Sequence, residues 1–209
     1  TEYRGHAIDI VKNEKLTDYD GIIAAGGDGT LFEVVNGIFQ NPIKRKNKIP
    51  IGILPIGTGN AFCRDIGLKT DEWRAAIDLI SQKKRSNVDV GEIMTHGQAY
   101  YFLNIVGLGF VADVNRVAQK LKIFGNLSYT LGVIYEVIKL GHYPLEITID
   151  GKTHHRENIF VEVSNTRYTA NFLMAPDALF DDGYLDITLL NRTTRRRLLR
   201  AFPKIFTGE

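Results

Sequence analysis

The sequence predicts an α/β protein in two parts, and three observations lead to this prediction. Two hydrophobic strands, at 21–25 and 49–54, each run into a glycine-rich turn followed by a helix. From residue 86 onward the pattern changes to alternating strands and hairpins. Helix–strand alternation is typical of parallel sheets, whereas hairpins are typical of antiparallel ones. We therefore expect a helix–strand domain at 1–90 and a strand-rich domain at 91–209.

The composition is that of an ordinary soluble globular protein. The chain has 209 residues, of which 44% are hydrophobic and 24% charged. Its one cysteine, Cys63, excludes an internal disulfide framework and fits a reducing compartment. No signal peptide is visible, and the longest apolar segment, 127–140, is too short and too polar to span a bilayer. We expect a cytoplasmic location. Because the chain starts at Thr1 and not at a methionine, we also expect a fragment, or a protein whose termini are missing from this sequence.

The first glycine-rich turn, Gly26-Gly27-Asp28-Gly29-Thr30, is a candidate phosphate site. It lies between a strand and a helix whose Leu31, Val34, Val35 and Ile38 share one face. Such a turn leaves backbone N–H groups open at a helix N-terminus, where a phosphate binds well. Asp28 would repel a phosphate unless a cation lies between them, and it can instead cap the helix. A plain tight turn remains the alternative interpretation.

A second turn, Pro55-Ile56-Gly57-Thr58-Gly59-Asn60, strengthens the phosphate interpretation. It also follows a hydrophobic strand and precedes a helix at 61–65. Two such turns at successive strand ends predict neighbouring parallel strands. Their carboxyl ends then form one crevice, where open α/β sheets bind ligands.

The other elements follow from periodicity and turn residues. We expect helices at 5–14 and 71–81, the latter with Thr70 as N-cap and with Trp73, Ala76, Ile77 and Ile80 facing inward. Helices are also expected after Gly109 and at about 126–140. Strands are expected at 88–93, 100–106, 145–149, 158–163 and 184–190, with hairpin turns at His96-Gly97 and Asp150-Gly151.

Several chemistries are disfavoured, and one acidic run stays open. The sequence lacks zinc-ligand spacing, a GxSxG elbow, the GxxxxGK[ST] loop and a strict GxGxxG turn. The run from Asp177 to Asp186 clusters acids around Gly183, and carboxylates with carbonyls suit magnesium. An Asp- and Gly-rich turn without a metal is the interpretation that the residues alone favour.

The C-terminal segment is basic. Residues 191–209 hold six Arg or Lys, against the single acid Glu209. Such a segment suits anionic lipid or nucleic acid, and a solvated helix face explains it equally well.

Four motifs, in order and spacing, resemble the diacylglycerol kinase catalytic family, which includes soluble bacterial lipid kinases and the sphingosine and ceramide kinases. The motifs are GGDGT with its following EVVNG, LPIGTGN at 54–60, NIVGLG at 104–109, and APDA to LD at 175–186. The resemblance implies a Rossmann-like nucleotide-binding domain followed by a β-sandwich-like second domain with inserted helices.

The resemblance also implies cofactors and site residues. ATP contacts are implied for Thr1, Gly26, Gly27, Asp28, Gly29, Thr30, Leu31, Phe32, Gly57, Thr58 and Asn60. A structural Mg²⁺ is implied at the Leu179 carbonyl, the Asp182 carboxylate and the Tyr184 carbonyl. Asp89 matches a position tied by water to this metal, and Asp28 would approach the phosphates through magnesium.

The implied activity is ATP- and Mg²⁺-dependent phosphorylation of a lipid hydroxyl, with diacylglycerol giving phosphatidic acid. Alternatives are a sphingoid base or another acceptor, and a non-catalytic nucleotide- or lipid-binding module. Phe32 and Ala61 depart from residues common in the family. The family's catalytic aspartate, in an Asp-Gly-Glu motif, is expected beyond Glu209, so no catalytic residue is assigned.

The expected partners are a lipid substrate at the inner membrane surface and anionic lipid, with no nucleic acid and with a homodimer possible. The anionic lipid would bind through four arginines: Arg192, Arg195, Arg196 and Arg197.

Overall fold

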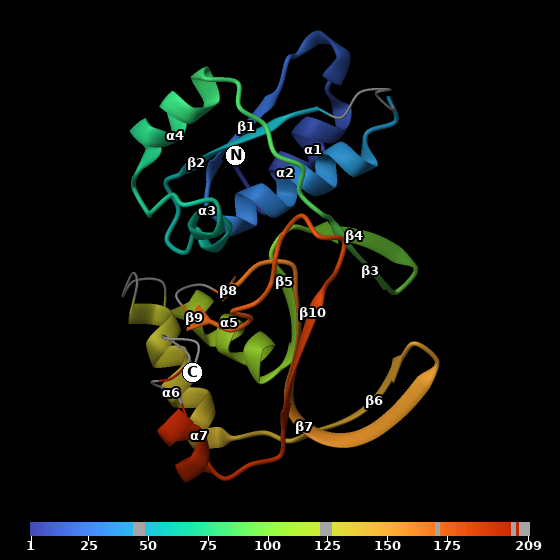
Figure 1. Ribbon diagram of the computed structural model, residues 1–209, viewed down its shortest axis with the longest axis vertical. Coiled ribbons are helices and arrows are strands. Elements are labelled where there is room, and N and C mark those ends of the chain that lie inside the picture. The colour runs from blue at the N-terminus through green and yellow to red at the C-terminus, as the bar shows by residue number, and fades with distance from the viewer. Residues whose placement is uncertain (44–48, 122–126, 170–171, 202–203, 205–209) are drawn as a thin grey trace. The chain divides into compact units, whose positions relative to one another are not determined.

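The computed structural model describes residues 1–43, 49–121, 127–169, 172–201 and 204, and it confirms the mixed α/β class (Figure 1). The chain forms two compact units. The first comprises Thr1–Asn104 with Leu179–Tyr184, and the second comprises Ile105–Ala178 with Leu185–Glu209. The predicted domains at 1–90 and 91–209 stay a prediction, because they were defined by sequence pattern whereas these two units are defined by compactness.

The first unit is built on two parallel strands. Strands β1 (Ile22–Gly26) and β2 (Ile51–Pro55) pair in register from Ile22 opposite Ile51 to Gly26 opposite Pro55, which confirms the predicted parallel neighbours. The helices are α1 (His6–Asn13), α2 (Asp28–Gln40), α3 (Ala61–Asp65) and α4 (Trp73–Ser81), with a 3-10 turn at Leu16–Asp18. An antiparallel hairpin of β3 (Gly91–Thr95) and β4 (Gln98–Phe102) follows.

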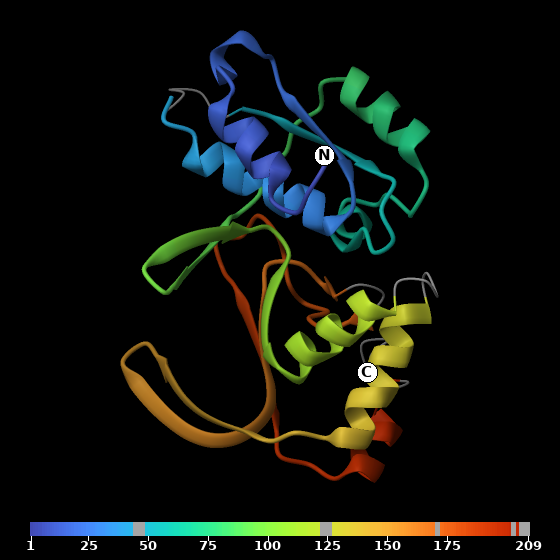
Figure 2. The same cartoon turned by 180° about the vertical axis from the view of Figure 1, so that it is seen from behind.

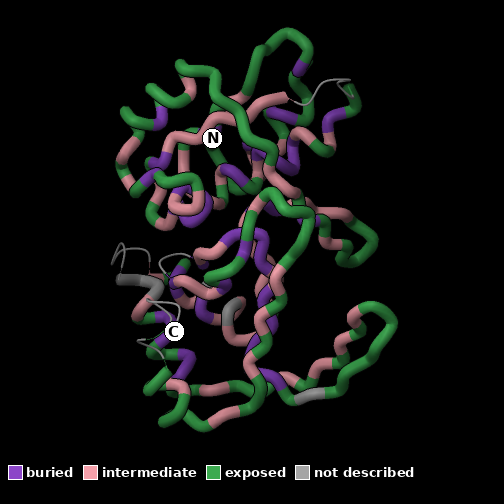
Figure 3. The backbone as a smooth tube through the Cα atoms, in the orientation of Figure 1, coloured by how far each residue is buried: buried purple, intermediate pink, exposed green. Residues whose placement is uncertain are grey.

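Helix α2 organises the core of this unit. Its Leu31, Val34 and Val35 are buried and pack with residues of α1 and β1. Figure 3 colours the backbone by burial, with buried positions in purple. It also fixes α1 at both ends. The Glu33 carboxylate accepts hydrogen bonds from the amides of Gly5 and Ala7, at 2.8 and 3.1 Å. The Asn41 side chain, just after α2, donates to three carbonyls at the C-terminal end of α1, those of Val11, Lys12 and Glu14.

Helix α4 differs from its prediction in two ways. Its N-cap is Glu72, not Thr70, and the Glu72 carboxylate accepts from the Lys69 amide at 2.8 Å. Ala76 is buried, but Trp73 and Ile77 are 36% and 45% exposed. The inward face is narrow because α4 packs on the single strand β2.

Strand β1 is also less buried than expected. Its Ile23 is 54% exposed, because this side chain lies on the face of the sheet that α4 covers only in part.

The second unit is organised around one long strand. Strand β7 (Lys152–Ser164) pairs antiparallel with β5 (Ile105–Gly109), β6 (Tyr143–Ile149) and β10 (Asp186–Asn191). The β6–β7 hairpin forms a curved arm (Figure 2). Its turn is the predicted Asp150-Gly151, with φ of 49° and 75°. The short strands β8 (Tyr168–Thr169) and β9 (Phe172–Leu173) were not predicted, since two residues carry no readable period.

In the described part of the second unit, the helices are α5 (Phe110–Lys120), α6 (Leu127–Lys139) and α7 (Arg195–Ala201). Helices α5 and α6 pack through Val114, Val133 and Val137, with Phe172 of β9 in the same cluster. Among the described residues, no helix has the length and hydrophobicity that crossing a membrane requires.

Candidate functional site

The two glycine-rich turns that follow β1 and β2 touch each other. A Cβ atom on Gly57 would overlap the backbone of Gly27, and a Cβ on Gly27 would lie 3.3 Å from the Gly57 Cα. Only glycine fits at this crossing without a backbone shift. The predicted pairing of the turns at one sheet edge is therefore observed, and its physical basis is close backbone approach.

Asp28 ties these turns together through its carboxylate. Its oxygens accept hydrogen bonds from the amides of Ala61 and Phe62 at 3.0 and 3.2 Å, and from the Asn104 side chain at 2.9 Å. Asp28 thus satisfies open amides at the N-terminus of α3. The alternative interpretation, that Asp28 caps its own helix, is wrong because the N-cap of α2 is Gly27. The magnesium-linked role stays a prediction.

The N-terminus of α2 offers backbone donors. The amides of Thr30 and Leu31 bond to the Gly27 carbonyl at 3.0 and 3.1 Å. Within the described part of the chain, no hydrogen bond is assigned to the amides of Asp28 and Gly29. Open amides at a helix N-terminus favour an anion, so this turn can hold a phosphate.

Asn60 adds a buried acceptor to the second turn. It has a left-handed backbone with φ of 50°, and it is 1% exposed. Its side-chain nitrogen donates to the Gly57 carbonyl at 2.6 Å, while its Oδ1 has no partner in the described residues. A buried oxygen without a donor is costly, so a bound donor such as a ligand hydroxyl or a water would stabilise the turn.

The other predicted ATP residues differ in their surroundings. Leu31 is 1% exposed and belongs to the core, so it offers a ligand only its backbone. Phe32, Thr58 and Thr1 are exposed. No hydrogen bond of the described residues joins Thr1 to either glycine turn, so its predicted contact gains no support from the geometry.

The predicted metal turn is fastened to Asp89. The Asp89 amide donates to the Phe180 carbonyl at 2.7 Å, and its carboxylate accepts from the Gly183 amide at 2.6 Å. The Asp182 carboxylate accepts from the Tyr184 amide at 3.0 Å. Sequence reasoning placed Asp89 near this turn only through the resemblance, and the direct contact was not expected.

The donors of this turn fit a hard cation. Asp182 supplies a carboxylate, while Leu179 and Tyr184 supply backbone carbonyls, and oxygen ligands are those that Mg²⁺ prefers. Among the described residues no group of three or more His, Cys, Asp or Glu side chains surrounds one point. A metal here would therefore depend on backbone carbonyls and water in addition to the Asp182 carboxylate, and this site stays a prediction.

Cys63 is a packing residue. It is buried beside Leu68 and Ala76, and burial, with a contribution from Asp28, raises the pKa of its thiol to about 11. A neutral thiol of this kind is a poor nucleophile, in line with the sequence-based interpretation.

Parallel strands that end in two touching glycine turns, beside open helix amides, are an arrangement in which α/β proteins bind phosphate groups. The family model for the diacylglycerol kinase catalytic domain matches residues 1–93, and the model for the YegS C-terminal NAD kinase beta sandwich-like domain matches residues 104–209. The chain belongs to the diacylglycerol kinase family of lipid kinases.

Individual relatives agree with this assignment. The diacylglycerol kinase of Bacillus subtilis (strain 168) is 33% identical over 212 residues, covering 100% of this chain and 67% of the relative. Sphingosine kinase 1 of Arabidopsis thaliana is 29% identical, covering 100% of this chain and 52% of the relative. A crystal structure of a diacylglycerol kinase from Bacillus anthracis str. Sterne has a TM-score of 0.71 and 27% identity, covering 98% of this chain and 65% of that chain. The chain thus spans about two thirds of the length of these bacterial relatives.

Proposed function

We propose that the protein transfers the γ-phosphate of ATP to the hydroxyl of diacylglycerol, giving phosphatidic acid. The observation that carries this proposal is the contact between the two glycine turns, with Asp28 bonded across it to α3. Phosphoryl transfer depends mainly on positioning and charge stabilisation, and a rigid amide-lined turn supplies both for the donor.

Each part of the chain has a distinct task in this proposal. The amides of Asp28 and Gly29 bind phosphate oxygens, and the Gly27–Gly57 contact keeps the turns at fixed separation. When bound, Mg²⁺ offsets phosphate charge at the donor and stabilises the turn of Asp182. No residue of the chain is assigned as the base that takes the proton of the lipid hydroxyl.

Sphingoid bases are a second class of acceptor, and one specific observation favours them. Sphingosine kinase 1 of Arabidopsis thaliana covers the whole of this chain at 29% identity. An acceptor screen with γ-labelled ATP separates the two classes: the proposal expects label in phosphatidic acid and none in a sphingoid-base phosphate. Label in the sphingoid product alone would replace diacylglycerol as the substrate, and nucleotide binding without any labelled lipid would favour a non-catalytic module.

We further propose a peripheral contact with anionic lipid at the inner membrane surface, made by α7. Arg196 and Arg197 are exposed, and no hydrogen bond or ion pair of their side chains is described. Arg192 instead bonds to the Glu157 carboxylate at 2.6 Å, and Arg195 donates to the Lys139 carbonyl at 3.4 Å. Of the four arginines expected to bind lipid, Arg196 and Arg197 therefore support this contact best.

A further inference from the structure

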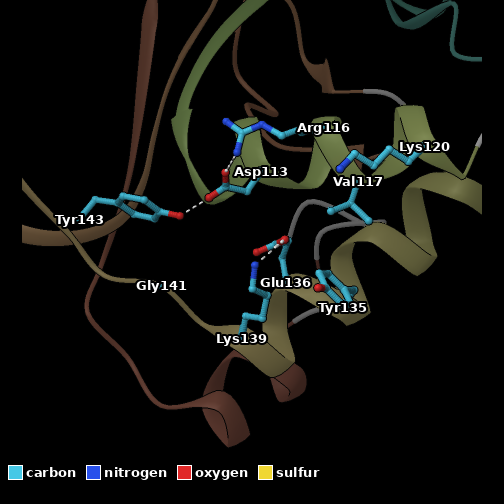
Figure 4. A pocket seen from close by; sticks show the side chains of 9 residues that line it. All are labelled: Asp113, Arg116, Val117, Lys120, Tyr135, Glu136, Lys139, Gly141 and Tyr143. Carbon is cyan, nitrogen blue, oxygen red and sulfur yellow. Dashed lines mark hydrogen bonds and ion pairs between the residues drawn. The ribbon is translucent and has the colours of Figure 1, made fainter.

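The second unit contains a charged cavity that the phosphate-donor site does not use. It has a volume of about 380 Å³ and lies between α5 and α6, beside the start of β6 (Figure 4). This volume is within the range of small-molecule sites and well above that of a single ion. Its lining residues are Asp113, Arg116, Val117, Lys120, Tyr135, Glu136, Lys139, Gly141 and Tyr143.

The cavity holds two carboxylates, Asp113 on α5 and Glu136 on α6. Asp113 accepts a hydrogen bond from the Tyr143 hydroxyl and pairs with Arg116 at 3.2 Å, so its carboxylate is largely satisfied. Glu136 is 6% exposed, and in the described part of the chain its side chain has one ion pair, with Lys139 at 3.9 Å. This separation is long for a hydrogen bond, so the Glu136 carboxylate can accept from a further donor in the cavity.

Cationic side chains lie beside these carboxylates. Lys120 is exposed, and no ion pair of its ammonium group is described. It lies about one helical turn beyond Arg116, whose remaining guanidinium donors are not used by Asp113. Asp113, Arg116 and Lys120 therefore follow one another along α5 at intervals of about one turn.

This arrangement selects the charge of a ligand. A simple phosphate would be drawn to Lys120 and Arg116 but would meet the carboxylates of Asp113 and Glu136. A simple amine would meet three cationic side chains. A ligand that carries both charges offsets either repulsion, because its anionic group meets Lys120 while its ammonium group competes with Lys139 for Glu136.

We propose that this cavity binds a phosphoethanolamine-type zwitterion, with the phosphate at Lys120 and Arg116 and the ammonium group at Glu136. The ligand is either a soluble phosphoethanolamine ester or the head group of a membrane lipid. Diacylglycerol has no charged head group and therefore does not match this cavity. The inference is independent of the activity proposed above.

Exposed apolar side chains near the cavity favour a membrane lipid as the molecule that carries the zwitterionic head group. Tyr135 lines the cavity and is 49% exposed, and Leu131, Ile134 and Ile138 of the same helix are also exposed, by 38%, 45% and 65%. These positions recur at helical spacing, so they form one face of α6 on which acyl chains can lie.

The test measures binding of sn-glycero-3-phosphoethanolamine, sn-glycerol 3-phosphate and ethanolamine by calorimetry. The zwitterion is expected to bind at least tenfold more tightly than either single-charge compound. Lys120→Ala and Glu136→Gln are each expected to weaken zwitterion binding about tenfold or more, whereas Lys152→Ala, an exposed lysine on the β6–β7 turn, leaves it unchanged. A second arm compares co-sedimentation with vesicles of phosphatidylcholine alone and with added phosphatidylethanolamine, which separates the lipid from the soluble source.

Equal binding of glycerol phosphate and the zwitterion, unaffected by Glu136→Gln, would overturn the inference in favour of a plain anion site. Absence of binding in both arms would also overturn it. Melting temperatures of all variants, and their ATP affinity, are measured in parallel. Because Glu136→Gln preserves shape, an unchanged melting temperature with lost zwitterion selectivity identifies a ligand contact and not misfolding.

Discussion

At the scale of single residues, Asp28 shows how a motif can be recognised while its contacts are missed. The sequence predicts a polar residue at a strand-to-helix turn and offers two roles, a cap of its own helix and a contact through magnesium. The carboxylate instead bonds to Ala61 and Phe62 of α3 and to Asn104. These partners are 33 to 76 positions away in sequence, so no local pattern reveals them.

Substitution of Asp28 is expected to separate its structural role from a metal-linked one. Asp28→Ala removes three hydrogen bonds to a charged acceptor and should destabilise the protein by about 1.5–3 kcal/mol in urea unfolding. Asp28→Asn retains one acceptor oxygen and should cost less. If ATP binding by Asp28→Asn keeps the magnesium dependence of the wild type, Asp28 is a structural tie, and a lost magnesium dependence would contradict that role.

Gly57 offers a sharper test of the site. Gly57→Ala places a methyl group on the Gly27 backbone, and overpacking of this kind typically costs about 1–3 kcal/mol. We expect ATP affinity, measured by calorimetry, to fall at least tenfold because the two turns are forced apart.

The matched control is Gly29→Ala in the first turn, where an added Cβ meets nothing within 4 Å. Its stability should stay near that of the wild type. Because alanine keeps the backbone N–H that is proposed to bind phosphate, its ATP affinity should fall less than that of Gly57→Ala. Equal losses in both variants would show that the Gly27–Gly57 contact is not what shapes the site.

At the scale of elements, strong periodicity predicts where the helices and the hairpin lie. Tertiary packing determines which of their faces are buried and which side chains cap them. Helices α1 and α2 and the Asp150-Gly151 hairpin follow directly from apolar spacing and turn residues. The inward face of α4 does not, because the width of a buried stripe depends on the partner strand. Sequence patterns also did not reveal that Glu33 and Asn41 cap a different helix. Glu33 looks like an ordinary polar position of α2, and Asn41 looks like an ordinary residue following that helix.

Strand β7 carries a buried acid that should make stability depend on pH. Glu162 is fully buried, and burial raises its pKa, while hydrogen bonds from Thr169 and Ser164 offset part of that rise. The folded protein therefore holds a proton that the unfolded chain releases above its own pKa of about 4.3. The contribution of this site to stability thus falls as pH rises from that value to the folded-state pKa.

Glu162→Gln should remove this dependence, because glutamine stays neutral and has nearly the same shape. The melting temperature of the variant minus that of the wild type is expected to increase between pH 4.5 and pH 8. A difference that stays constant or shrinks over this range would show that the Glu162 carboxyl is not held neutral by burial.

Helix α7 allows a test of the lipid contact. Neutralising Arg196 and Arg197 together with glutamine should weaken binding to phosphatidylglycerol vesicles roughly 30-fold, at about 1 kcal/mol per charge. The Lys83→Gln, Lys84→Gln double variant changes net charge equally in the first unit and should bind as the wild type does. Equal weakening of both variants would indicate a general charge effect and not a surface at α7.

At the scale of the whole molecule, the sequence predicts the architecture, but it does not predict the chemistry of the acceptor. The glycine turns give a geometric signal because only glycine permits backbones to touch, and this signal predicts a phosphate site from residues alone. The charged cavity between α5 and α6 gives no such signal. Asp113, Lys120 and Glu136 are ordinary helix residues, and only the packing of the two helices brings them to one cavity.

The most direct test of the proposed function is transfer of ³²P from [γ-³²P]ATP to diacylglycerol in mixed micelles by the full-length gene product. We predict labelled phosphatidic acid that requires Mg²⁺, falls at least tenfold with Gly57→Ala and falls less with Gly29→Ala. ATP binding by the folded protein without any labelled lipid, or equal transfer by the two glycine variants, would contradict the account.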